Sequence, residues 1–187
     1  MSAIALIAAL ASSVPLESST LPLPPELRES ASIVSLDSAG KVTTLRSGAG
    51  KMVCIADAPD DDTFDVRCYH RDFIPYLYRV RQLSAEGVVD TDIDVRIEQE
   101  LEAGTFHMTM KPSAGYRMYG PLTALTENGT AWTDEMWRWQ SIHIPRATAE
   151  DLGFVTEDFF AENDALMPYV MASGDLWAHV MINSPPD

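Results

Sequence analysis

The stretch KMVCIADAPDDDTFDVRC, residues 51–68, contains both cysteines of the chain, Cys54 and Cys68. Two cysteines cannot form a closed zinc site by themselves, but they can form one disulfide. Closing a loop of this size would stabilise the fold by about 3 kcal/mol on the chain-entropy model. Disulfides persist in oxidising compartments, so the alternative for a cytosolic protein is a pair of buried free thiols.

Five carboxylates lie within or beside the loop that this disulfide would close: Asp57, Asp60, Asp61, Asp62 and Asp65. Hard cations such as calcium take oxygen ligands of this kind. The stretch lacks the glycine and the glutamate that an EF-hand loop has at its sixth and twelfth positions. A calcium site is therefore one expectation for these residues, and a solvated acidic loop is the alternative.

The sequence before this stretch is typical of an exported protein. Residues 1–11 are rich in Ala, Ile and Leu and end in a small-x-small pattern, as in a signal peptide, although no Lys or Arg precedes Arg28. The alternative is an N-terminal helix docked on the core. Residues 12–30 are rich in Pro and Ser, a composition that disfavours helices and sheet pairing, so we interpret them as a tether. The remaining residues, 31–187, would form one domain, secreted or periplasmic.

Composition limits the possible partners. The 187 residues are 46% hydrophobic, which is enough for one well-packed core. The formal net charge of −15 would repel phosphate backbones, so nucleic acid is not expected as a partner. The apolar run at the start is too short to span a bilayer, which needs about 20 apolar residues, so no transmembrane anchor is expected.

Periodicity predicts a domain of mixed helices and strands. Strands are expected over residues 32–36, 41–46, 51–56, 106–110, 116–119, 136–144, 166–171 and 177–182, between turns rich in Gly, Pro, Asn and Asp. Apolar residues at helical spacing predict one helix from Asp72 to Gly87 and a second from Thr91 to Gly104, where Thr91 and Asp94 have capping-box spacing. Short helices are expected over residues 148–163. These elements predict an α+β fold, with a mixed or mainly antiparallel sheet packed by two helices.

Two of the four histidines are the candidate metal ligands. His143 shares a strand face with Ser141, and His179 shares one with Trp177 and Met181. The two imidazoles could share a metal, but neither has ligand spacing in the sequence, and a buried, hydrogen-bonded imidazole is the alternative. No Gly-x-Ser-x-Gly elbow is present, so the sequence assigns no catalytic residue and leaves enzymatic activity open.

Trp137 and Trp139 alternate as expected of one sheet face. If this face is exposed, it could bind sugars or a partner chain. If it is covered, it is ordinary core.

The chain resembles a group of uncharacterised exported bacterial proteins. The resemblance rests on a cysteine-containing strand after a Gly-containing turn, an acidic loop with a second cysteine and a following helix, and on PYVMASG at residues 168–174 with AHVMI at residues 178–182. This group has no assigned activity, so the resemblance implies export and a shared fold but no mechanism.

Taken together, the sequence predicts an exported, disulfide-stapled α+β domain that acts as a binding or structural module. Its ligand and partner are unknown, and no cofactor is expected apart from the calcium ion considered above. The alternative is a metal-binding protein or metal-dependent enzyme that uses His143 and His179.

Overall fold

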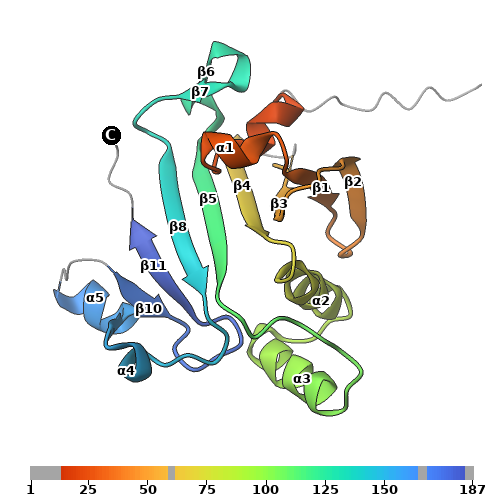
Figure 1. The fold of residues 1–187 in the computed structure, drawn as a ribbon, viewed down its shortest axis with the longest axis vertical. Helices are drawn as coiled ribbons and strands as arrows, with labels where there is room; N and C mark the ends of the chain where they lie inside the picture. Colours follow the sequence, from red (N-terminus) through yellow and green to blue (C-terminus); the bar gives the residue numbers. More distant parts are fainter. Residues whose placement is uncertain (1–13, 59–61, 164–167, 184–187) are drawn as a thin grey trace, which may run out of the picture.

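A computed structural model describes residues 14–58, 62–163 and 168–183 (Figure 1). The signal-peptide-like segment of residues 1–11 and the acidic residues Asp60 and Asp61 lie outside the described residues. The described residues form an α+β fold built on a mostly antiparallel sheet, which confirms the predicted fold class.

The main sheet has nine strands within the described residues, in the order β2-β1-β3-β4-β5-β8-β11-β10-β9. The pairs β1–β3 and β9–β10 are parallel, and the other neighbours are antiparallel. A separate two-stranded sheet pairs β6 with β7. The strand bounds are β1 Ser32–Leu36, β2 Val42–Arg46, β3 Met52–Ile55, β4 Thr63–His70, β5 Ser113–Pro121, β6 Leu125–Thr126, β7 Ala131–Trp132, β8 Trp137–His143, β9 Val155–Thr156, β10 Tyr169–Met171 and β11 His179–Asn183.

The helices lie around this sheet. Their bounds are α1 Pro25–Arg28, α2 Ile74–Ala85, α3 Asp90–Glu102, α4 Ala149–Leu152 and α5 Glu157–Asn163, with short 3-10 helices η1 Leu16–Thr20, η2 Leu122–Ala124 and η3 Glu127–Gly129. Figure 1 shows α1 over β4 and β5, whereas α2 and α3 lie beyond the other end of these strands. In the described part of the chain, no helix has both the length and the apolar character that crossing a membrane requires.

The predicted disulfide is present, between Cys54 and Cys68. The two residues are direct cross-strand partners in β3 and β4, with their Cα atoms 3.9 Å apart. Both side chains are fully buried. Because side chains alternate along a strand, Cys54 and Cys68 point to one face of the sheet, while Val53 and Tyr69 point to the other.

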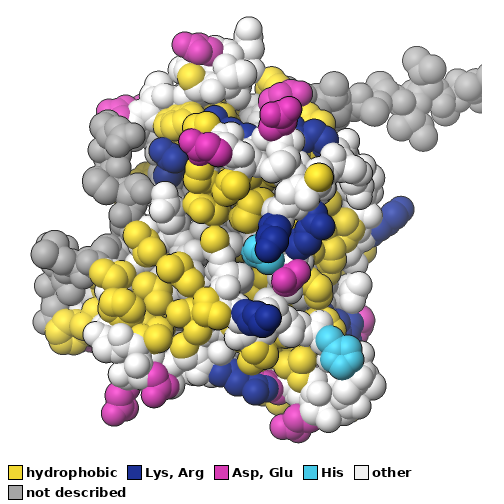
Figure 2. Space-filling view, viewed as in Figure 1, with side chains coloured by type: hydrophobic (Ala, Val, Ile, Leu, Met, Phe, Trp, Pro, Cys, Tyr) yellow, Lys and Arg dark blue, Asp and Glu magenta, His cyan; other side chains and the backbone are white. Residues whose placement is uncertain are grey.

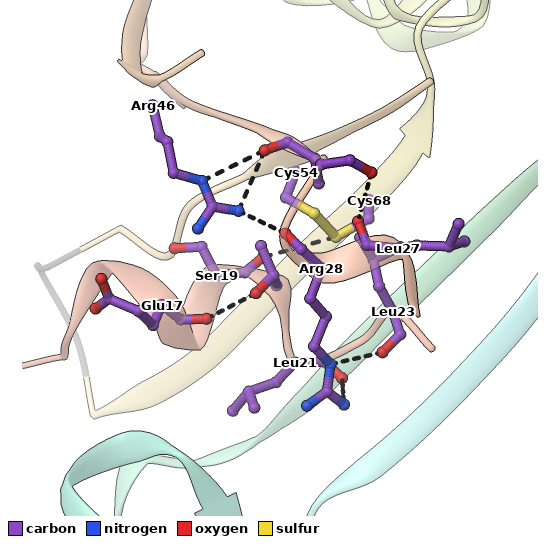
Figure 3. Close-up of a disulfide and its surroundings, with 12 residues drawn as sticks. Glu17, Ser19, Leu21, Leu23, Leu27, Arg28, Arg46, Cys54 and Cys68 are labelled. Carbon is purple, nitrogen blue, oxygen red and sulfur yellow. Dashed lines mark hydrogen bonds between the residues drawn. A yellow bond between two sulfur atoms is a disulfide. The ribbon is translucent and has the colours of Figure 1, made fainter. Parts of the chain in front are cut away.

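The face that carries the disulfide is covered by residues 14–31, here called the belt (Figure 3). Leu21 and Leu23 of the belt are buried in the same cluster as both cysteines. The carbonyl oxygen of Ser19 lies 3.6 Å from the Cys68 sulfur. We therefore name this side of the sheet the belt face.

The interpretation of residues 12–30 as a tether is wrong for the described residues of this segment. The prolines do exclude regular sheet pairing, but they also leave the backbone in short turns that place leucines on the sheet. Side chains satisfy the carbonyls that these turns expose. Arg28 Nε donates to the Leu23 carbonyl at 2.8 Å and Arg28 Nη2 to the Leu21 carbonyl at 3.1 Å, while Arg46 Nη2 donates to the Arg28 carbonyl at 2.7 Å (Figure 3).

The opposite side of the sheet is the helix face, because α2 and α3 pack on it. Val53 and Tyr69 of the sheet lie in one core cluster with Phe73, Leu83 and Ile97. The predicted helix pair is confirmed, with α2 and α3 close to the expected ranges. The expected capping box is wrong: α3 has no side-chain cap, because its N-cap is Val89 and the Asp94 carboxylate accepts a hydrogen bond from Tyr76 instead.

One long strand was not predicted, and one predicted strand is absent. The unpredicted long strand is β4, which follows the acidic residues and lies near the middle of the sheet. Its residues Phe64 and Val66 point to the belt face. The expected strand at residues 106–110 is irregular instead. Phe106 and Met108 have strand-like alternation because they pack against the cluster of α2 and α3, not because their backbone joins the sheet.

Candidate functional site

A cavity of about 680 Å³ opens on the helix face. Its floor comes from the ends of β1 and β3 and from β4 and β5, and its walls come from α2 and α3 and from the loop between β10 and β11. The lining residues are Leu36, Ile55, Ala56, Asp57, Ala58, Thr63, Asp65, Arg67, Tyr69, Tyr76, Leu77, Val80, Arg81, Asp90, Ile93, Asp94, Tyr119, Ala172, Asp175 and Trp177. The cavity is therefore assembled from elements that are far apart in the sequence.

A charged cluster lies on the cavity floor. Arg67 and Arg117 are direct cross-strand partners, a placement that is unfavourable for like charges. The Asp65 carboxylate resolves this conflict by accepting from both guanidinium groups. Its Oδ1 accepts from Arg67 Nε at 3.2 Å and from Arg117 Nε at 2.8 Å, and its Oδ2 accepts from the two Nη2 atoms at 2.7 and 2.9 Å.

These contacts set the protonation state of the cluster. Burial would raise the pKa of Asp65, but the hydrogen bonds from Arg67 and Arg117 outweigh burial and lower the pKa. The Tyr69 side chain lies next to Arg67, and burial raises the pKa of its phenol, so Tyr69 stays neutral. The cluster is therefore one carboxylate shared by two guanidinium groups.

Aromatic rings from α2 and from the loop between β10 and β11 meet in the cavity lining. The rings of Tyr76 and Trp177 are stacked, with centroids 5.8 Å apart and planes 20° apart. Both rings pack against Phe73, at 5.3 and 5.6 Å. This contact holds α2 against the loop between β10 and β11, so the two walls of the cavity are joined.

Asp94 is a half-buried acid that α3 contributes to the lining. Its Oδ1 accepts a hydrogen bond of 2.7 Å from the Tyr76 hydroxyl. Burial raises the pKa of Asp94, and the negative charges of Asp175 and Glu98 raise it further, while the bond from Tyr76 partly opposes the shift. The pKa of Tyr76 is raised as well, first by burial and then by Asp94. A carboxyl group with a raised pKa in a cavity is typical of functional sites.

The candidate metal ligands His143 and His179 come together outside the cavity lining. Their rings stack with centroids 4.8 Å apart, and their side chains belong to residues only 1% and 6% exposed. His179 Nδ1 donates to the Trp177 carbonyl at 2.8 Å, because a carbonyl can only accept. His143 Nε2 lies 3.2 Å from the Ser141 hydroxyl.

This geometry favours two neutral, packed imidazoles. Burial first and the neighbouring His179 second lower the pKa of His143 to about 3, and burial lowers the pKa of His179. Among the residues that the structure describes, no group of three His, Cys, Asp or Glu side chains could hold a metal ion. Metal binding by His143 and His179 therefore stays a prediction. The described residues provide no third protein ligand beside them.

The acidic loop is described only in part. Asp57 Oδ1 accepts from the backbone N–H of Asp65 at 2.8 Å and so joins the two ends of the loop. The Asp65 carboxylate is occupied by two arginines, and Asp62 is exposed. Because Asp60 and Asp61 lie outside the described residues, calcium binding by this loop stays a prediction.

The sheet face that carries Trp137 and Trp139 is exposed rather than covered. Trp137 is 65% exposed, and its ring stacks on Trp139 with centroids 6.4 Å apart. Tyr119 also packs against Trp139, with ring centroids 6.2 Å apart, and lines the cavity. Arg117 lies over the rings of Tyr119 and Trp139. These rings form an aromatic rim beside the charged floor of the cavity.

Sequence reasoning named Asp57 and Asp65 only as possible cation ligands, and it missed the other residues that line the cavity. A signal for Asp65 and Arg67 was present, since both alternate with Val66 and Cys68 and would share a face in a strand. No local signal identifies Asp94 or Trp177, because their partners lie on other elements.

Comparisons with known proteins give no relative from which a function could be transferred. No protein-family model, no curated protein and no solved structure matches the chain.

Proposed function

We propose that this chain is an exported domain that binds a small organic molecule in the cavity on its helix face. The cavity itself is the observation that carries this proposal. Its volume of about 680 Å³ lies in the range of known ligand pockets, roughly 300–1,000 Å³. Its lining joins aliphatic and aromatic side chains with a few polar groups, as ligand pockets do.

The polar groups of the lining support binding over a purely structural role. Replacing buried ion pairs by well-packed apolar side chains is often neutral or stabilising, so stability alone does not require them. Arg67 and Asp65 on the floor and Asp94 on the wall all border the cavity. Groups of this kind can fix the orientation of a ligand whose apolar body fills the centre.

Export is supported by two independent features. The Cys54–Cys68 disulfide indicates an oxidising compartment. The start of the sequence is typical of a signal peptide, and cleavage after Ala11 would leave the belt from residue 14 onwards intact. We also infer membership of the group of exported bacterial proteins that the chain resembles. Mass spectrometry of the protein recovered from its native cells would test export: we expect a mature N-terminus near residue 12 and an oxidised cysteine pair, and an intact start with free thiols would refute it.

Binding can be tested with N-phenyl-1-naphthylamine, a neutral fluorescent probe of apolar cavities. We expect saturable binding to the wild-type protein. Val80→Phe should abolish it, because Val80 lines the cavity from α2 and the larger ring would occupy the space. Ser84→Phe is the matched control, since Ser84 lies one turn further along α2, is exposed and does not line the cavity.

The outcome separates the cavity from other apolar surfaces. Figure 2 shows apolar side chains gathered on the side of the molecule that carries β11, β10 and α5. Exposed apolar side chains outside the cavity lining include Ile142 and Ile182, which are 38% and 37% exposed. If Val80→Phe left probe binding unchanged, the probe would be bound on such a surface, and the proposed function would be wrong.

A further inference from the structure

The lining of the cavity carries more negative than positive charge. It includes five aspartates and only two arginines, Arg67 and Arg81. Arg67 is already engaged by Asp65, which also binds Arg117. Arg81 is exposed at the rim. The protein as a whole carries a formal charge of −15, so its field attracts cations and repels anions.

Asp94 lies near two other acids. The charges that act on Asp94 are those of Asp175 and Glu98, and both are negative. Glu98 is paired with Arg146, whereas Asp175 lines the cavity from the loop between β10 and β11. Asp94 of α3 and Asp175 of the loop between β10 and β11 thus place two carboxylates in the lining of one cavity, and the charge of Asp175 helps to raise the pKa of Asp94.

Aromatic rings lie beside these carboxylates. The stacked pair of Tyr76 and Trp177 lines the cavity, and Tyr76 is hydrogen-bonded directly to Asp94. The face of an aromatic ring attracts cations, most strongly for tryptophan. A carboxylate next to aromatic rings is an arrangement that suits an ammonium group with an apolar body.

We infer that the cavity binds an organic cation, whose ammonium group lies between Asp94 and Asp175 and whose apolar body packs on Tyr76 and Trp177. This inference rests on the proposed function, because it assigns the chemical class of the ligand to the same cavity. An anionic ligand is disfavoured, because Asp65 already accepts hydrogen bonds from Arg67 and Arg117 and the other lining arginine, Arg81, is exposed.

Three compounds with one phenylpropyl body test the charge directly: 3-phenylpropylammonium, 3-phenylpropan-1-ol and 3-phenylpropionate. By isothermal titration calorimetry, we expect the ammonium compound to bind about tenfold more tightly than the alcohol, because it gains a charge-assisted hydrogen bond. We expect the propionate to bind more weakly than the alcohol. The uncharged body is the same in all three, so the differences report the charge.

Asp94→Asn identifies the residue responsible. The asparagine oxygen can still accept from Tyr76, so the wall keeps its hydrogen bond while losing its charge. We expect this variant to lose about tenfold in affinity for the ammonium compound and to bind the alcohol as the wild type does. Asp92→Asn is the control, because Asp92 is on the same helix, exposed and outside the cavity lining.

The possible outcomes separate this inference from the proposed function. Equal affinities for the ammonium compound and the alcohol, tightest binding of the propionate, or an unchanged ammonium affinity in Asp94→Asn would each overturn the inference about charge. So would failure of all three compounds to bind while N-phenyl-1-naphthylamine still binds in the cavity. In those cases cavity binding itself stands. If instead Val80→Phe binds the naphthylamine probe as the wild type does, the proposed function is overturned.

Discussion

The belt should contribute to stability as a part of the core, and Leu23→Ala measures this contribution. Leu23 is 0% exposed and lies in the cluster that contains the disulfide. Truncating a buried leucine to alanine costs about 2–5 kcal/mol, since both apolar burial and packing are lost. With a typical urea m value of about 2 kcal/mol/M, a loss of about 3 kcal/mol lowers the denaturation midpoint by about 1.5 M.

Leu27→Ala is the matched control, in the same segment and with the same change of side chain. Leu27 is 36% exposed and lies in α1, where alanine is at least as favourable as leucine. We expect a change within about 0.5 kcal/mol, or about 0.25 M urea. The measurement is urea unfolding at fixed pH, followed by both fluorescence and circular dichroism to check that the transitions coincide. Equal midpoints for Leu23→Ala and Leu27→Ala would refute the view that the belt completes the core.

Three further predictions follow from the structure. Replacing Cys54 and Cys68 together by alanine should lower the free energy of unfolding by about 3 kcal/mol from loop entropy, as measured by urea unfolding, and an unchanged midpoint would contradict this. Because burial lowers the pKa of His143 to about 3, this imidazole binds a proton more tightly in the unfolded chain than in the folded protein. Stability should therefore fall as pH decreases from about 6.5 toward 3, by up to about 1.4 kcal/mol per pH unit, and a His143→Phe variant should show a smaller slope. Asp65→Ala should cost about 1–2 kcal/mol because two guanidinium groups then face each other without a carboxylate, whereas Asp62→Ala, at an exposed position, should be neutral within about 0.5 kcal/mol.

The elements that could be predicted are those whose signal is local. The helices α2 and α3 follow from apolar residues at helical spacing, and the strands β1, β2 and β3 follow from short alternating runs between glycine turns. The pairing of Cys54 with Cys68 was predictable because no other cysteine competes. The short helix α4 also begins where the sequence predicts it, after Thr148, whose side chain caps the helix by accepting from the Asp151 N–H.

The features that were missed depend on contacts between distant segments. The belt has the composition of a tether, and only the sheet beneath it makes Leu21 and Leu23 core residues. In β4 the alternation of Phe64, Val66 and Cys68 indicates a strand, but the neighbouring acidic residues led to the prediction of a loop. The cavity combines residues from strands, two helices and a distant loop, so no window of sequence contains it.

The disulfide fixes the register between β3 and β4, and this register decides which side chains lie on each face of the sheet. Cys54 and Cys68 are neighbours in sequence of Ile55 and Arg67, which are themselves cross-strand partners and lie on the cavity floor. A shift of one residue between β3 and β4 would exchange the faces and would turn Arg67 toward the belt, where no partner for its charge is described among the buried residues of that cluster. A covalent bond between direct partners prevents this shift. The disulfide therefore does more than stabilise the fold, because the register that it fixes also determines which side chains reach the cavity.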